Sequence, residues 1–212
     1  MNQITRVKIC GITRTEDALA SEQYGADALG FVFVKASKRF IEPDTAKTII
    51  EQIGPFITRV GLFLEAPASE IEQALSIIPG LMPQFHGRET PEECERYGVP
   101  YIKAIGLGAG MPSADELAAY KNACAFLFDS NEPGKLGGTG HVFDWQKLDQ
   151  NVDRPIILAG GLNPDNVAGA IEQIRPYAID VSSGVEAAKG VKDHAALRAF
   201  LAKVHQVDAN SC

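Results

Sequence analysis

The chain has little cysteine and no long apolar run. Its four cysteines stand at positions 10, 94, 124 and 212, with no CxxC pair. This scatter excludes a secreted disulfide framework and a Cys/His metal cluster, so we expect free thiols and no metal. No stretch is long enough to span a bilayer, and residues 1–6 lack the apolar segment of a signal peptide. We therefore expect a cytoplasmic protein with no membrane partner.

Positive charge is also scarce. Lys and Arg number 20 against 27 Asp and Glu, which gives a net charge of −7. This balance argues against a nucleic-acid partner. An anionic small molecule stays open as a ligand, but backbone amides and a few local cations would have to hold it. The apolar content of 45% is ordinary for a globular protein that buries a full core.

Apolar runs alternate with helix signals from one end of the chain to the other. Residues 27–33, for example, are almost continuously apolar, as in a strand that is covered on both faces. Strands are expected at 7–11, 27–33, 57–64, 81–86, 101–105, 124–129, 155–159 and 177–182. Eight strand–helix units with no linker favour a single-domain (β/α)8 barrel over residues 1–212. A doubly wound open sheet is the alternative, although it usually has fewer units.

Helix starts carry recognisable capping signals. Capping-box spacing predicts helix starts at Thr13/Glu16, Thr90/Glu93 and Ser113/Glu116, and single caps are expected at Asn163 and Asp193. A short helix is expected at 143–148. The last helix should end near Val204, which leaves 206–212 as a frayed tail.

The first strand ends in a thiol. Because side chains alternate along a strand, Lys8 and Cys10 point to the same face. Ligands gather at the carboxyl ends of parallel strands, and Cys10 stands at such an end. Lys8 is then placed to favour the thiolate. Cysteine is also among the most buried residue types, so inert packing is the alternative for Cys10.

Two glycine-containing loops follow the last two strands. Gly160 and Gly161 come directly after the seventh strand, and Ser183 and Gly184 follow the eighth and lead into a short helical stretch. In (β/α)8 barrels these two loops form a phosphate site from backbone N–H groups. One glycine pair alone would indicate only a tight turn, but both loops together favour phosphate binding.

Other polar side chains stand at strand ends, each with an ordinary alternative. Asp129 ends an apolar strand, and these surroundings could keep its carboxyl group protonated so that it acts as a general acid. The alternative is an ordinary loop or N-cap aspartate. Asp180 is either a ligand-facing or a structural carboxylate. His86 is either a site residue or a structural histidine in the barrel wall. Arg39 either reaches the barrel mouth or lies in solvent. The glycine-rich segment 131–141 is expected to be a mobile lid or a plain flexible loop.

Eight motifs stand in order along nearly the whole chain. They are Lys8-Ile9-Cys10-Gly11, Ser37-Lys38-Arg39, Val60-Gly61-Leu62-Phe63, Gln84-Phe85-His86-Gly87, Phe128-Asp129-Ser130, Gly137-Gly138-Thr139-Gly140, Leu158-Ala159-Gly160-Gly161-Leu162 and Asp180-Val181-Ser182-Ser183-Gly184-Val185-Glu186. Together they closely resemble the phosphoribosylanthranilate isomerase family, the (β/α)8 enzymes of tryptophan biosynthesis. Departures are small: Phe85 stands where leucine is common, and Gly106 where a larger residue is frequent.

The resemblance implies an Amadori rearrangement without a cofactor. The substrate would be N-(5'-phosphoribosyl)anthranilate and the product 1-(2-carboxyphenylamino)-1-deoxyribulose 5-phosphate. The implied roles are general base for Cys10, general acid for Asp129, substrate contacts for Arg39, His86 and Asp180, and the phosphate cradle for Gly160, Gly161, Ser183 and Gly184. Arg39 would suit the anthranilate carboxylate. We expect Lys8 to join the substrate contacts.

Two other functions stay open at this stage. Another sugar-phosphate barrel enzyme would share the phosphate loops, but the histidine-pathway isomerase has an aspartate where Cys10 stands. Indole-glycerol-phosphate synthase uses catalytic lysines and glutamates that have no counterpart here. A non-catalytic phosphate-binding barrel would need neither Cys10 nor Asp129. We expect a monomer, although the sequence does not fix the oligomeric state.

Overall fold

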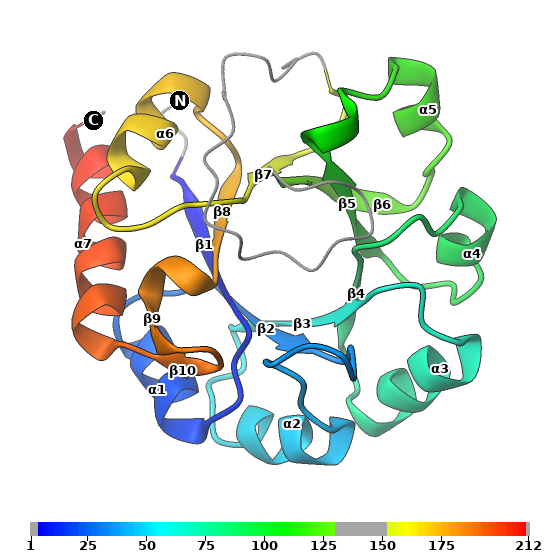
Figure 1. Ribbon diagram of the computed structural model, residues 1–212, viewed down its shortest axis with the longest axis horizontal. Helices are drawn as coiled ribbons and strands as arrows, with labels where there is room; N and C mark the ends of the chain where they lie inside the picture. The colour runs from blue at the N-terminus through cyan, green and yellow to red at the C-terminus, as the bar shows by residue number, and fades with distance from the viewer. Residues whose placement is uncertain (1–3, 130–151, 211–212) are drawn as a thin grey trace.

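Eight parallel strands close into a barrel in the computed structural model of the chain, which describes residues 4–129 and 152–210 (Figure 1). Each strand pairs with the next along the chain, and β8 pairs with β1 to close the ring. The strands are β1 (Arg6–Cys10), β2 (Ala28–Val32), β3 (Thr58–Phe63), β4 (Met82–Phe85), β5 (Tyr101–Gly106), β6 (Ala123–Asp129), β7 (Ile156–Leu158) and β8 (Ala178–Val181). The predicted barrel is confirmed, and the alternative of an open sheet is wrong.

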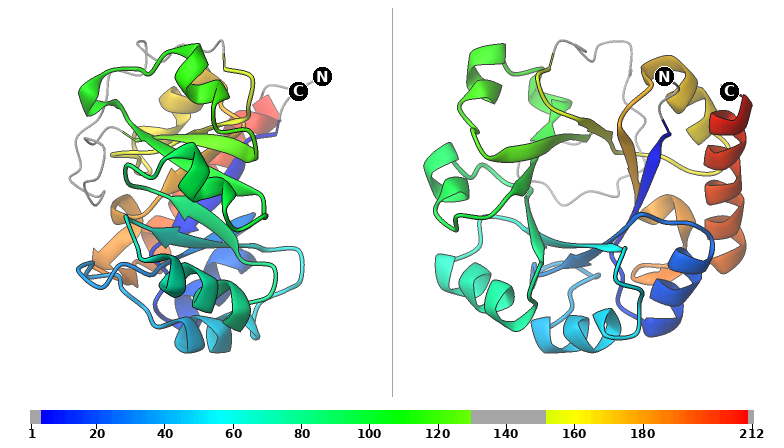
Figure 2. Two further views of the ribbon diagram at one scale, coloured as in Figure 1. Left: turned by 90° about the vertical axis from the view of Figure 1, so that its right-hand side faces the viewer. Right: turned by 180° about the vertical axis from the view of Figure 1, so that it is seen from behind.

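Helices surround the barrel on its outside (Figure 2). They are α1 (Thr15–Gln23), α2 (Pro43–Ile50), α3 (Ala68–Ile77), α4 (Pro91–Glu95), α5 (Ala114–Ala118), α6 (Val167–Ile174) and α7 (His194–Asn210). Two short 3₁₀ helices, η1 (Leu107–Ala109) and η3 (Ser183–Val185), and a small hairpin of β9 (Glu186–Ala188) and β10 (Val191–Lys192) complete the described chain. The helix expected at 143–148 and the lid expected at 131–141 lie outside the described residues.

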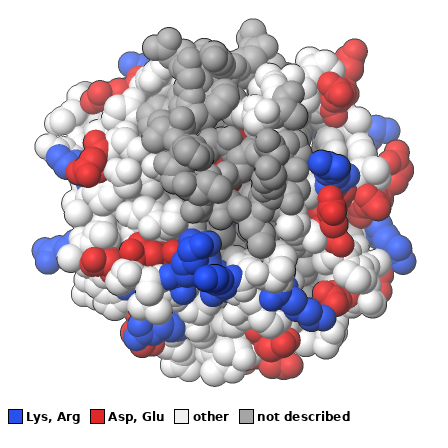
Figure 3. All heavy atoms as spheres, viewed as in Figure 1, with Lys and Arg blue, Asp and Glu red and all other residues white. Residues whose placement is uncertain are grey.

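Charges of both signs are interspersed on the face that Figure 3 shows. Lys and Arg lie next to Asp and Glu over most of the described part of this face. On this face the acidic side chains are thus spread out and do not form one acidic region.

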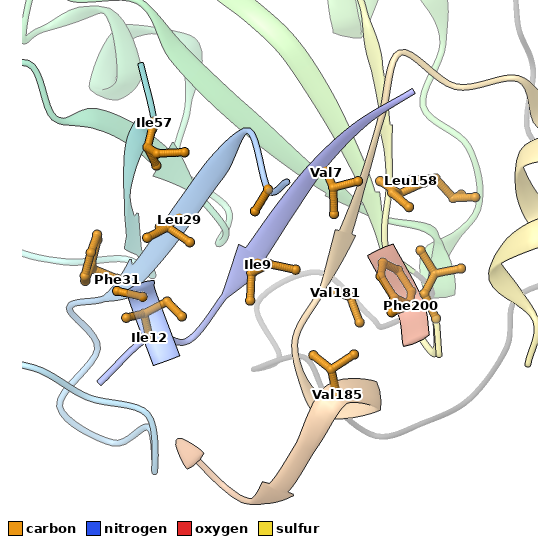
Figure 4. Close-up of a cluster of buried hydrophobic side chains, with 14 of the residues drawn as sticks. Val7, Ile9, Ile12, Leu29, Phe31, Ile57, Leu158, Val181, Val185 and Phe200 are labelled. Atoms are coloured by element: carbon orange, nitrogen blue, oxygen red, sulfur yellow. The ribbon is translucent and has the colours of Figure 1, made fainter. Parts of the chain in front are cut away.

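Both faces of each strand are buried, which explains the continuous apolar runs. Val7 and Ile9 of β1 belong to the large core, which also takes in Phe200 of α7 (Figure 4). Small and branched side chains fill the interior of the barrel: Val60, Ile102, Ala104, Ala125, Leu127, Ile157, Ala159 and Ala178. Alternation along β1 therefore turns Lys8 and Cys10 away from the layer that holds Val7 and Ile9.

Three of the five predicted caps form, and those at Thr13 and Asn163 do not. The side chains of Thr90 and Ser113 accept hydrogen bonds from the backbone N–H groups of Glu93 and Glu116, as expected for capping boxes. The box predicted at Thr13 is wrong. The Thr13 hydroxyl donates instead to the carbonyl oxygen of Gly190, at 2.5 Å, so a tertiary contact with the β9–β10 hairpin takes the place of the local cap.

Two helix boundaries also differ from the prediction. Asn163 does not cap α6 directly; its side-chain oxygen accepts from the backbone N–H groups of residues 165 and 166 and forms a turn before the helix. Asp193 caps α7 as predicted. The helix runs on to Asn210 instead of fraying, because Val207 is buried and the Asp208 carboxylate accepts hydrogen bonds from the backbone N–H and the hydroxyl of Thr5.

Candidate active site

A cavity lies at the carboxyl ends of the strands and gathers most of the residues that the sequence singled out. Those that line it are Cys10, Arg39, His86, Asp129, Gly160, Gly161, Asp180 and Ser183. Lys8 and Gly184 do not line the cavity but support residues that do. The topology explains the gathering, because every parallel strand of a barrel delivers its last side chain to the same end.

Cys10 lies beside a buried ion pair. Lys8 Nζ is 2.8 Å from Asp180 Oδ1, across the β1–β8 pairing. Burial raises the pKa of the Cys10 thiol, whereas the positive charge of Lys8 lowers it. The sequence prediction that Lys8 favours the thiolate is therefore right in direction, but burial outweighs it in the free protein. Burial alone would lower the pKa of Lys8, yet Asp180 raises it, so Lys8 stays charged.

Asp129 faces an imidazole across the cavity. His86 Nε2 lies 3.7 Å from Asp129 Oδ2, and both side chains are almost fully buried. Burial lowers the pKa of His86, although the Asp129 carboxylate opposes this shift, so the ring is neutral at pH 7. The amide nitrogen of Gln84 lies 3.1 Å from Nδ1. This contact holds one side of the ring and turns Nε2 towards Asp129.

Arg39 reaches the cavity and is held by a partner that the sequence did not reveal. Its Nε and Nη2 donate to the two oxygens of Glu186, at 2.8 and 2.7 Å. Burial alone would raise the pKa of Glu186, but Arg39 and Lys192 lower it, so this carboxylate is ionised. Gly11 makes room for the guanidinium arm: a Cβ there would lie 2.5 Å from Arg39 Cδ.

The two predicted phosphate loops lie against each other. Gly160 and Gly161 have φ values of +87° and +67°, a conformation that strongly favours glycine. A Cβ on Gly184 would lie only 1.9 Å from the carbonyl oxygen of Leu162, so the two loops can touch only through glycine. Ser182 Oγ is buried and has no hydrogen-bond partner within the described part of the chain. Both loops line the same cavity, through Gly160, Gly161, Ser182 and Ser183.

Comparison with known proteins shows to which family the chain belongs. Residues 7–203 match the family model described as N-(5'phosphoribosyl)anthranilate (PRA) isomerase. The chain is 51% identical, over 94% of its length and 95% of the relative's, to the N-(5'-phosphoribosyl)anthranilate isomerase of Pseudomonas fluorescens (strain SBW25). The chain belongs to the phosphoribosylanthranilate isomerase family.

Solved phosphoribosylanthranilate isomerases share the fold over almost the whole chain. The enzyme from Thermus thermophilus is 43% identical, with a TM-score of 0.85 and coverage of 95% of this chain and 99% of that one. A second, 37% identical with a TM-score of 0.77 and the same coverage, was solved in complex with reduced 1-(o-carboxyphenylamino)-1-deoxyribulose 5-phosphate. Membership makes the chain an isomerase that catalyses an Amadori rearrangement, an intramolecular redox reaction, in tryptophan biosynthesis.

Sequence reasoning missed three residues around this isomerase site: Ser182, Glu186 and Lys192. Ser182 and Glu186 stand within a quoted motif, yet no local pattern gives them a role. Lys192 is bonded to the backbone of Cys10, 182 residues away in the sequence. Such long-range pairs become visible only once the barrel has closed.

The described residues contain neither a metal-binding cluster nor a helix that could span a membrane. In residues 4–129 and 152–210, no group of three or more His, Cys, Asp or Glu side chains is placed to hold a metal ion. Over the same ranges, the helices all fall short of the length and apolarity that crossing a membrane requires.

Proposed function

We propose that the chain converts N-(5'-phosphoribosyl)anthranilate to 1-(2-carboxyphenylamino)-1-deoxyribulose 5-phosphate, with Cys10 as general base and Asp129 as general acid. The observation that carries this proposal is that both groups line one cavity, at the carboxyl ends of β1 and β6. These strands are three positions apart around the barrel, so the two groups approach a bound substrate from different sides.

The first step opens the ribose ring. The acid form of Asp129 gives its proton to the ring oxygen as the bond between that oxygen and C1 breaks. The lone pair of the anthranilate nitrogen then forms the C1=N bond, which leaves an iminium ion. His86, whose Nε2 lies 3.7 Å from Asp129 Oδ2, is placed to support the negative charge that Asp129 acquires.

The second step moves a proton from carbon. Cys10, as thiolate, takes the proton from C2, and the electron pair of that bond becomes the C1=C2 bond while the iminium electrons return to nitrogen. The resulting enolamine tautomerises to the ketone. Burial raises the pKa of the Cys10 thiol in the ligand-free protein. In the bound intermediate, the positive charge of the iminium would lower this pKa and so favour the thiolate.

The two ends of the substrate carry negative charge and have separate partners. We assign the phosphate to the loops with Gly160, Gly161 and Ser183, where backbone N–H groups and glycine allow close approach. Arg39 is assigned to the anthranilate carboxylate; the Glu186 pair uses two of its N–H groups and orients the others. The ligand of the solved relative, which has both a phosphate and a carboxylate, supports this division.

A coupled assay with substrate generated in situ tests the proposal. Purified protein should consume the fluorescent phosphoribosylanthranilate and form product, and the Cys10→Ala variant prepared in parallel should not. Absence of turnover by folded wild-type protein would contradict the proposed function.

The expectations on location and assembly stay predictions. A cytoplasmic location is consistent with the pathway, and we propose a monomer. A relative from Thermotoga maritima is described as dimeric. Phe56, a residue that is 97% exposed, is an apolar group that a second copy could cover. Sedimentation velocity at micromolar concentration decides between the two states.

A further inference from the structure

One buried cation has no role in the steps above. Lys192 ends β10, and its side chain is 0% exposed. Its ammonium donates to the carbonyl oxygens of Cys10 (2.6 Å) and Ser182 (3.2 Å) and to Glu186 Oε1 (3.1 Å). These bonds use all three N–H groups of the ammonium. The cation thus joins the residues at the ends of β1 and β8 to the carboxylate that holds Arg39.

We propose that Lys192 is a positioning residue that fixes Cys10 relative to the loop after β8 and to Arg39. Lys192 is not among the residues that line the cavity, so it acts through these neighbours and not on the substrate. The inference rests on the proposed function, because it gives Lys192 its role through the base and the carboxylate-binding arginine.

Packing alone does not explain a charge at this place. Burying an ammonium is costly, and a well-packed apolar side chain of similar size often gives equal or greater stability. An apolar side chain cannot, however, bond two strand-end carbonyls and a carboxylate at once. Those three bonds set the distances between separate parts of the site, and catalysis is sensitive to errors of about 1 Å in such distances.

The charge of Lys192 also acts on the thiol. Within residues 4–129 and 152–210, the charged groups that face Cys10 are Lys8 from its own strand, Asp180 from β8, Lys192 from β10 and Arg39 from the loop after β2. Burial raises the pKa of the Cys10 thiol and Asp180 adds to this, whereas Lys8 and Lys192 lower it.

These groups form two sets with different net charge. Lys8 and Asp180 neutralise each other as one ion pair. Glu186, by contrast, pairs with both Arg39 and Lys192. Burial lowers the pKa of Lys192 and the Glu186 carboxylate opposes this shift; with both cations charged, the set has one excess positive charge. Replacing Lys192 by a neutral residue removes the excess, and the thiolate of Cys10 then loses stabilisation.

The test uses the whole protein and two variants, Lys192→Met and Lys192→Arg. Alkylation of Cys10 by iodoacetamide is followed against pH, with the Cys10 peptide read by mass spectrometry, and kcat and KM are measured in parallel. In Lys192→Met we expect the alkylation midpoint to rise by about half to one pH unit. We also expect kcat to fall about tenfold or more, since the base is less well placed. Lys192→Arg should recover most of the midpoint shift.

Lys103 provides a matched control for the alkylation readout. It is a second buried lysine whose ammonium donates to two backbone carbonyls, of Phe85 and Gly87, and to one carboxylate, of Glu89. Lys103→Met should cost comparable stability without moving the Cys10 midpoint. A folded Lys192→Met protein with the wild-type midpoint and kcat would overturn the proposal, as would an equal shift in Lys103→Met.

Failure to fold is also decisive. If Lys192→Met does not fold, the polar Lys192→Gln variant is compared on the same readouts, with the same expected direction. If both neutral variants fail to fold while Lys192→Arg is fully active, Lys192 serves stability alone and the proposal is overturned. Alkylation needs no turnover. If the wild-type protein has no isomerase activity, the proposed function is contradicted. If the alkylation midpoint of Cys10 still rises in Lys192→Met, the influence of Lys192 on Cys10 is supported all the same.

Discussion

Arg39 and Glu186, which are 147 residues apart in the sequence, form a two-pronged ion pair at the edge of the cavity. The guanidinium is thereby held in one orientation before any ligand arrives. A planar fork that is fixed in this way suits a second carboxylate, such as that of anthranilate. The cost of ordering Arg39 is then met on folding and does not recur when substrate binds.

Glu186→Gln should therefore weaken substrate binding. The amide keeps the shape but loses the charge and one acceptor, so Arg39 is held less firmly. We expect KM to rise about tenfold, with a smaller effect on kcat, in steady-state assays. Glu70→Gln is the control, because its pair with Lys35 is exposed and such pairs contribute little. Equal KM values for wild type and Glu186→Gln would contradict a binding role for this pair.

The phosphate assignment is tested at Gly161. Any side chain at this positive φ is strained, so Gly161→Ala measures the effect of strain alone. Gly161→Asp adds a negative charge where we place the phosphate. We expect Gly161→Asp to raise KM far more than Gly161→Ala, in proteins that both retain the wild-type circular dichroism spectrum. If the two variants have the same KM, the phosphate binds elsewhere.

The end of α7 should contribute to stability. Asp208→Ala removes the acceptor for both the backbone N–H and the hydroxyl of Thr5 at the start of the barrel's first strand. We expect the free energy of unfolding to fall by about 1–2 kcal/mol in urea titrations. The catalytic residues are far along the strand from this contact, so kcat should not change. An unchanged unfolding midpoint would mean that the helix end is frayed in solution, as the sequence alone suggested.

Local patterns were enough to predict the barrel and the positions of most of its site residues. A strand that is buried on both faces has a continuous apolar run, and the glycines after β7 and β8 mark where the chain turns tightly. The failures have a common cause in tertiary partners. Thr13 does not cap α1 because its hydroxyl bonds Gly190 instead. The partners of Arg39 and Lys192 likewise come from distant parts of the chain, where no spacing rule applies.

We propose that Asp129 and Cys10 act in successive steps, Asp129 as the acid and then Cys10 as the base. Asp129→Asn cannot donate as a carboxylic acid, and Cys10→Ala removes the base. Each should lower kcat by at least about a hundredfold, with far less effect on binding, because the phosphate is held elsewhere. Wild-type kcat in Cys10→Ala would mean that Cys10 serves only as packing.

The most direct measurement is the kinetic isotope effect with substrate deuterated at C2, compared between Cys10→Ser and Asp129→Asn. A serine is a poorer base, so proton abstraction should limit the rate in Cys10→Ser and the isotope effect should exceed that of the wild type. Ring opening should limit the rate in Asp129→Asn, and the isotope effect should fall towards one. The reverse order, or the same isotope effect in both variants, would contradict the assignment of the two roles.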